Sequence, residues 1–337
     1  MTGNDRFRHW LPFWALIAAV ILLPVIVPSK YVISVMFLVA IYGVLSLSLG
    51  ILIGHAGLFS LAQPTWFGVG AYVAGVLAVR NIVPPWIGII GGALFVAFIA
   101  YLLGAPLLRL RGHYLACATF GVLIIGEIAF VQLSGLTGGN TGLLDIPPLS
   151  IYGFVFRNIL HYYFLSWALC IASLWFYSNL VKSRVGRAIR SSHDSETASK
   201  AMGINVPKYR LQLFVLTSAV TALAGGIFCF YLRFAAPSIF SFALLVELIL
   251  MIIIGGIGDL WGYLLGSLVI LWLGESINVY LSKILPVMTG EVQAVFFGIL
   301  IILVLIFMPR GLSGWVNQFM HWGKRTYGQV RRKTVDG

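Results

Sequence analysis

Long apolar segments recur along the whole chain and constrain its fold more than any other feature. A helix needs about 20 predominantly apolar residues to cross the hydrocarbon core of a bilayer. Such segments lie at 11–28, 31–53, 64–79, 86–106, 113–132, 160–180, 209–232, 242–256, 259–281 and 290–308. Because 60% of the 337 residues are hydrophobic and only 9% are charged, a soluble domain is excluded. We expect an all-α polytopic membrane protein with about ten transmembrane helices.

The placement of positive charge predicts how these helices are oriented. Cytoplasmic loops of membrane proteins carry an excess of Lys and Arg. With the N-terminus inside, the cytoplasmic pieces hold 17 of the 22 Lys and Arg residues, which also explains the net charge of +12 without a nucleic-acid partner. The outer pieces hold only Lys30, Arg80, Arg157, Arg233 and Lys283. We expect a multi-pass membrane protein with both termini in the cytoplasm.

The same topology divides the chain into one transmembrane domain and a tail. The transmembrane domain is predicted over 1–308, with an external loop at 133–159 and a cytoplasmic loop at 179–210. The Gly-rich start of the external loop suits a docking surface for a solute-binding protein, although an ordinary turn-rich loop explains its composition equally well. The basic tail, 309–337, mixes aromatic and cationic residues that suit the inner membrane face.

The longest charged stretch, 183–214, contains the signals of a short surface helix. Ser191 followed by Asp194 fits a helix start, where a side-chain oxygen accepts a free backbone N–H. Gly203 suits a left-handed stop, and Pro207 soon after prevents the helix from continuing. A small apolar face lies between them, at Ala198, Ala201 and Met202. We expect one docking helix over 191–203; the plainer alternative is a solvated connector.

Two Gly-interrupted stretches break the apolar pattern at membrane depth. The first, 54–72, includes Gly54, His55, Gly57, Gln63 and Pro64, and the second, 255–262, begins with Gly255 and Gly256. Irregular backbone at this depth is tolerated only where protein or a water-filled cavity satisfies it. We expect discontinuous or re-entrant helices there, which are the best sequence sign of a solute pathway. Helix packing through small residues is the competing interpretation.

Three carboxylates also lie within predicted spans, namely those of Glu127, Glu247 and Glu275. Carboxylates at membrane depth are costly unless they face the bundle interior or water. Each has two interpretations: a structural group that is hydrogen-bonded inside the bundle, or a group that lines the pathway. The three cysteines have no metal-binding or redox spacing, and we expect no metal site.

Several strings, in the same order, resemble the permeases of the branched-chain amino acid ABC importer family (LivM-type). Glu196, Ala198, Ala201 and Gly203 look like the EAA loop, which docks into the ATP-binding subunit, and the wider string adds Arg187 and Asp194. Similar family segments match 54–72, 109–116, 137–142, 255–262 and 308–312. Departures from the family pattern occur at Leu58, Ala62, Gln63 and Pro64, and they leave the solute open.

The resemblance covers about 38–312 and implies a transport subunit of the bacterial inner (plasma) membrane, not an enzyme. Its implied solutes are branched-chain amino acids or related amides such as urea. Its implied partners are two ATP-binding subunits, a sister permease subunit and an external solute-binding protein. No Walker A string is present, so we expect ATP to be bound by those partners and no cofactor in this chain. The implied coupling residues are Arg187, Asp194, Glu196, Ala198, Ala201 and Gly203.

For the solute pathway we single out Gly54, His55, Gly57, Gln63, Glu127, Glu247, Gly255 and Gly256. The main alternative function is a self-contained secondary transporter or channel, which the intramembrane acids would suit. A membrane enzyme acting on lipid-linked substrates ranks last, because the acids are scattered over separate spans.

Overall fold

The computed structural model describes residues 3–110, 112–151 and 154–284 of the chain. Within them, nine of the ten predicted spans are helices, and this confirms an all-α polytopic membrane protein. The nine are α1 (Gly3–Ile26), α2 (Lys30–Ala56), α3 (Gln63–Val79), α4 (Pro85–Leu107), α5 (His113–Gln132), α7 (Ile159–Lys182), α10 (Val206–Leu232), α11 (Phe242–Gly255) and α12 (Leu260–Ile284). The tenth predicted span, 290–308, and the tail, 309–337, lie outside the described residues.

Five of these helices are long and apolar enough to cross a membrane, namely α2, α4, α5, α7 and α10. Helix α11 has only 14 residues, which corresponds to about 21 Å at 1.5 Å per residue. Since the hydrocarbon core is about 30 Å thick, α11 is too short to cross it alone. It pairs instead with α12 in a helical hairpin.

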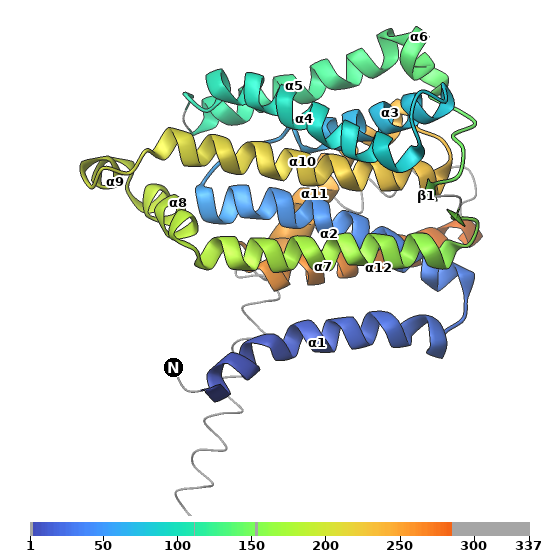
Figure 1. Ribbon diagram of the computed structural model, residues 1–337, viewed down its shortest axis with the longest axis horizontal. Helices are drawn as coiled ribbons and strands as arrows, with labels where there is room; N and C mark the ends of the chain where they lie inside the picture. Colours follow the sequence, from blue (N-terminus) through green and yellow to red (C-terminus); the bar gives the residue numbers. More distant parts are fainter. Residues whose placement is uncertain (1–2, 111, 152–153, 285–337) are drawn as a thin grey trace, which may run out of the picture.

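The core of the bundle is formed by α2 and α10, the most buried of the long helices. Helix α2 packs against α7, α10 and α12, and α10 packs against α3 and α4. Figure 1 shows α4 and α5 on one side of this pair and α7 on the other. The peripheral helices leave apolar faces exposed, as lipid-facing helices do.

Helix α1 lies at the edge of the bundle, beside α7 (Figure 1). The Tyr163 hydroxyl of α7 donates a hydrogen bond to the carbonyl of Val20 at 2.8 Å. The ring of Phe13 meets Trp261 of α12 edge-on, with centroids 5.0 Å apart. These contacts fasten α1 to the surface of the bundle without placing it in the core.

The two ends of the bundle carry different connections (Figure 1). At one end lie two short helices, α8 (Arg184–Asp194) and α9 (Glu196–Ala201). At the other end lie α6 (Ser134–Thr137), η1 (Gly139–Thr141), the hairpin of β1 (Ser150–Ile151) and β2 (Phe154–Val155), and η2 (Pro237–Phe240). The loops predicted on opposite sides of a membrane therefore lie at opposite ends of the molecule. Which end faces the cytoplasm stays a prediction.

Candidate functional site

The polar segment between α7 and α10 forms two helices, where one was predicted. Ser183 caps α8, because its Oγ accepts the N–H of Gly186 at 3.1 Å. Ser195 caps α9, because its Oγ accepts the N–H of Ala198 at 3.3 Å. Each cap satisfies a backbone donor that a helix start leaves free. The predicted helix start at Ser191 is therefore wrong, since Ser191 lies in the last turn of α8.

An ion-pair network holds α8 and α9 against the start of α10. The carboxylate of Glu196 lies 3.1 Å from Nη1 of Arg210 and 2.8 Å from Nζ of Lys200. The other arm of the guanidinium, Nη2 of Arg210, donates to the carbonyl of Ser192 in α8 at 3.3 Å. The Arg210 side chain is only 14% exposed, so its charge depends on these partners. Three helices are thereby fixed relative to one another.

The residues predicted to contact an ATP-binding subunit lie along this element. Five of the six are exposed: Arg187, Asp194, Ala198, Ala201 and Gly203. Gly203 has φ +77°, the left-handed conformation expected at this helix end. The sixth, Glu196, differs because its carboxylate is engaged within the chain. The exposed small residues and Met202 remain available to a partner, whereas Glu196 positions the helix that carries them.

The first predicted helix break is confirmed, and it spans 57–62, between α2 and α3. Gly57 adopts φ +63°, and its N–H donates to the carbonyl of Leu52. The imidazole of His193, from α8, lies so close to Gly57 that a Cβ on this glycine would overlap it. The break therefore touches the element predicted to dock the ATP-binding subunit.

The other residues predicted to interrupt this region lie inside helices. Gly54 is in the last turn of α2, whereas Gly68 and Gly70 are in α3. A Cβ on Gly70 would overlap the backbone of Ala222 in α10, so this glycine permits close packing. Pro64 is in the first turn of α3, where proline is tolerated. The packing interpretation thus holds for these positions, and the break itself depends on Gly57.

The second break, 256–259, lies against the last turn of α2, the helix that leads into the first break. Gly256 and Gly258 adopt φ values of +99° and +96° between α11 and α12. The Tyr263 hydroxyl donates to the carbonyl of Gly50 in α2 at 3.0 Å and accepts from the N–H of Gly258 at 2.7 Å. A Cβ on Gly54 would come within 2.8 Å of the Gly258 nitrogen. We define the junction as these two breaks, Tyr263 and the His193 side chain that touches Gly57.

Buried polar groups extend from the first break into the bundle. Thr119 of α5 accepts the N–H of Leu61 at 3.0 Å, so protein satisfies part of the irregular backbone. Gln63 is fully buried, and its Oε1 accepts the Thr221 hydroxyl of α10 at 2.9 Å. Several buried polar atoms between 55 and 72 have no hydrogen-bond partner in the described part of the chain: Nδ1 of His55, Oγ of Ser60, Nε2 of Gln63, Nε1 of Trp66 and the Tyr72 hydroxyl. They are buried polar groups whose hydrogen-bonding capacity the described part of the chain leaves unused.

The intramembrane acids do not gather at the junction. Glu127 of α5 accepts the backbone N–H of Phe242, the first residue of α11. Glu275 accepts the Tyr31 hydroxyl at 2.9 Å. Each of these two therefore has a structural hydrogen bond, whereas Glu247 is half-buried on α11. Over the residues that the structure describes, no three His, Cys, Asp or Glu side chains form a group suited to a metal ion.

Of the predicted pathway residues, the structure brings Gly54, His55, Gly57, Gly255 and Gly256 to the junction. Gln63 begins α3 farther along the same segment, and Glu127 and Glu247 lie elsewhere. Sequence reasoning missed His193, Tyr263 and Thr221. His193 and Tyr263 stand in or next to the polar and Gly-rich stretches already singled out, whereas Thr221 lies within an apolar span and has no such signal.

The chain is similar to known transport proteins, both to a whole family and to individual relatives. The sequence model of a family described as "Branched-chain amino acid transport system / permease component" matches residues 31–305. The chain is 26% identical to the high-affinity branched-chain amino acid transport system permease protein LivM of Escherichia coli, over 84% of this chain and 70% of that protein.

Two more distant relatives have different names. A probable branched-chain amino acid transport permease protein, LivH of Methanocaldococcus jannaschii, is 25% identical over 76% of this chain and 82% of its own length. The fructose import permease protein FrcC of Rhizobium meliloti is 22% identical over 69% of this chain and 66% of its own length.

Proposed function

Because the chain belongs to the family of permease components of branched-chain amino acid transport systems, we propose that it forms the membrane pathway of an ABC importer. The solute is a branched-chain amino acid or a related small amide. Two separate ATP-binding subunits supply the energy, and this chain has no ATPase site of its own. A sister permease subunit completes the pathway, and an external solute-binding protein delivers the solute.

The contact between α8 and the first helix break carries this proposal. The exposed small residues in and just after α9 suit a docking surface, and His193 of the neighbouring α8 packs on Gly57. Tyr263 joins α2, the helix that leads into this break, to the second break through two hydrogen bonds. A force applied to α8 therefore acts on the first break directly and reaches the second break through α2 and Tyr263.

The coupling mechanism follows from this arrangement. When the ATP-binding subunits close, they displace α8 and α9 as a unit, because Glu196 and Arg210 bind these helices to α10. The displacement moves His193 and shifts the junction between two discrete packings, since close-packed interiors are not continuously deformable. We propose that these packings correspond to inward-open and outward-open states, with the α8–α9 end in the cytoplasm.

The first helix break and α3 also carry chemical groups that suit the proposed solute. A zwitterionic amino acid carries both charges on its backbone and needs donors and acceptors more than a fixed counter-ion. The Gln63 amide, the Ser60 hydroxyl and the Tyr72 hydroxyl are neutral groups of this kind. The buried rings of Trp66 and Phe214, whose centroids lie 6.0 Å apart between α3 and α10, are apolar neighbours for a branched side chain if these helices separate during transport.

The decisive experiment is uptake into liposomes that contain the complete complex. We expect labelled leucine, isoleucine or valine to accumulate only when the binding protein is outside and ATP reaches the ATP-binding subunits. Fructose serves as a control, since a relative is a fructose import permease. Accumulation driven by an ion gradient without ATP would instead support a secondary transporter. ATP-driven accumulation of urea or fructose alone would retain the importer and change its solute.

A further inference from the structure

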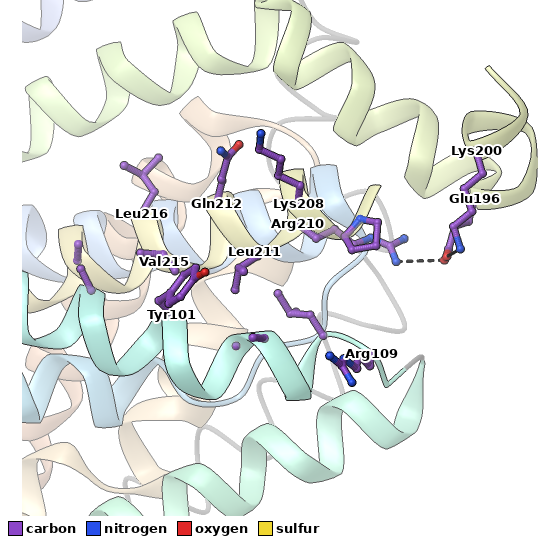
Figure 2. A pocket seen from close by; sticks show the side chains of 16 residues that line it. Tyr101, Arg109, Glu196, Lys200, Lys208, Arg210, Leu211, Gln212, Val215 and Leu216 are labelled. Atoms are coloured by element: carbon purple, nitrogen blue, oxygen red, sulfur yellow. Dashed lines mark hydrogen bonds and ion pairs between the residues drawn. The ribbon is translucent and has the colours of Figure 1, made fainter. Parts of the chain in front are cut away.

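A long groove opens on the side of the bundle where α4 and α10 run next to each other. Its volume is about 1020 Å³, at the upper end of the roughly 300–1,000 Å³ typical of small-molecule pockets. Figure 2 shows its walls, which come from both helices. Along most of its length the lining is apolar or aromatic: Ala97, Tyr101 and Ala105 of α4, and Leu211, Val215 and Ala219 of α10.

One end of the groove is strongly basic. Arg109, Lys200, Lys208 and Arg210 line it, against the single carboxylate of Glu196. Arg210 and Lys200 are engaged by that carboxylate. Arg109 and Lys208 are exposed, and neither has an ion-pair partner within the described residues. Two cations are therefore free to bind an anion where the apolar groove ends.

The dimensions of the groove match one leaflet of a bilayer. Its lining runs from Ala97 on α4 to Arg109, two residues beyond the end of that helix, and from Pro207 to Ala219 on α10. Each stretch rises about 18 Å at 1.5 Å per residue. Half of the hydrocarbon core is about 15 Å thick. When the basic end lies at the membrane surface, the apolar part therefore reaches the middle of the bilayer.

We propose that this groove binds an anionic phospholipid. The phosphate lies between Arg109 and Lys208, and an acyl chain runs along Tyr101 and Val215. Basic pockets between transmembrane helices bind anionic head groups in this manner. The basic end and the apolar length of the groove favour this occupant, because a phospholipid joins an anionic head group to long apolar chains. The bound head group would lie beside the Glu196–Arg210 ion pair, which positions α9.

Native mass spectrometry of the purified complex, titrated with phosphatidylglycerol and with phosphatidylcholine, tests the charge requirement. We expect preferential binding of phosphatidylglycerol. The double variant Arg109→Gln/Lys208→Gln should weaken that binding about 25-fold, or about fivefold for each cation removed. The matched control, Lys182→Gln/Arg184→Gln, removes two exposed cations at the α7–α8 connection and should leave it unchanged. Equal binding of the two lipids, or equal loss in both variants, would overturn the proposal.

Photo-crosslinking identifies the occupant of the apolar part. A benzophenone side chain replaces Tyr101, which is 56% exposed in the groove. In membranes that contain the assembled complex, we expect the crosslinked product to carry a phospholipid. A crosslink to the sister permease or to an ATP-binding subunit would show that a protein partner covers this face, and the lipid site would be rejected. Neither outcome depends on which solute is transported.

Discussion

At the residue scale, Gly57 combines a left-handed backbone with a close neighbour. Its φ is +63°, a conformation that costs other residues about 1–2 kcal/mol. A Cβ would also overlap the His193 imidazole. Gly203 has a similar backbone, with φ +77°, but nothing within 4 Å of the position its Cβ would take. Substituting each glycine in turn therefore separates the effect of backbone strain, which both positions share, from the effect of the contact with α8, which only Gly57 makes.

We predict that Gly57→Ala reduces ATP-driven uptake much more than Gly203→Ala does. Both variants carry backbone strain, but only the first displaces α8 from the junction. His193→Ala, which removes the ring that contacts Gly57, should lower the uptake as well. The measurement is uptake per assembled complex in liposomes. Equal losses in the two glycine variants, or full uptake by His193→Ala, would argue against transmission through this contact.

A second residue-scale prediction concerns Glu196. Glu196→Gln leaves the poorly exposed Arg210 without its charged partner, which should cost about 1–3 kcal/mol of stability. Lys200→Gln removes only the exposed end of the network, where ion pairs contribute about 0–1 kcal/mol. We therefore expect Glu196→Gln to lower the melting temperature in detergent and to weaken association with the ATP-binding subunits. If Lys200→Gln has the larger effect, Glu196 does not hold α9 through Arg210.

At the scale of elements, helix contact through small residues shapes the α11–α12 hairpin. A Cβ on Gly266 of α12 would overlap the carbonyl oxygen of Met251 in α11, and one on Gly255 would overlap the carbonyl of Gly262. Such close approach lets the short helix α11 pack along its full length against α12. The hairpin in turn presents Gly258 to Tyr263 at the junction.

We predict opposite effects on stability for alanine at two helical glycines. Gly266→Ala should destabilise the protein by about 1–3 kcal/mol, because the buried backbone must move to admit a methyl group. Gly121→Ala, in α5, meets nothing within 4 Å and should stabilise it by about 0.5–1 kcal/mol through helix propensity. Thermal unfolding in one detergent compares the two. A Gly266→Ala variant of undiminished stability would mean that α11 and α12 lie farther apart than they do in this structure.

At the scale of the whole molecule, the connections at the two ends differ in character. One end carries α8 and α9 with their charges, and the other carries the β1–β2 hairpin and short turns (Figure 1). The isolated bridge between Leu143 and Ala235 ties the long loop there to the chain that follows α10. Between the ends, exposed apolar side chains cover α4 and α5, as expected of surfaces that face lipid.

The predicted orientation can be tested with single cysteines at the two ends. Lys200→Cys and Asn140→Cys both introduce an exposed thiol, the first in α9 and the second in η1. In intact cells, a membrane-impermeant maleimide should label position 140 and reach position 200 only after lysis. Replacing the three native cysteines by serine supplies the background control. The reverse labelling pattern would place α8 and α9 outside and remove the basis for ATP coupling.

The amino-acid sequence alone determined the helical class, the number and bounds of most described spans, and the presence of two breaks. It could do so because helix hydrogen bonds and burial in lipid depend on neighbouring residues. Local signals such as Gly203 and Pro64 were informative for the same reason. Local signals did not specify where the docking element starts, because several serines in this segment can cap a helix. The start was predicted at Ser191, whereas the cap of the first helix is Ser183.

Only the tertiary structure decided which residues meet at the junction. His193 and Gly57 are far apart in the chain, and Tyr263 bonds to a carbonyl more than 200 residues away. The bond between Thr221 and Gln63 joins two spans whose sequences give no sign of the pairing. Such contacts depend on how the helices pack and rotate against one another, and no local pattern of apolar and polar residues specifies that geometry.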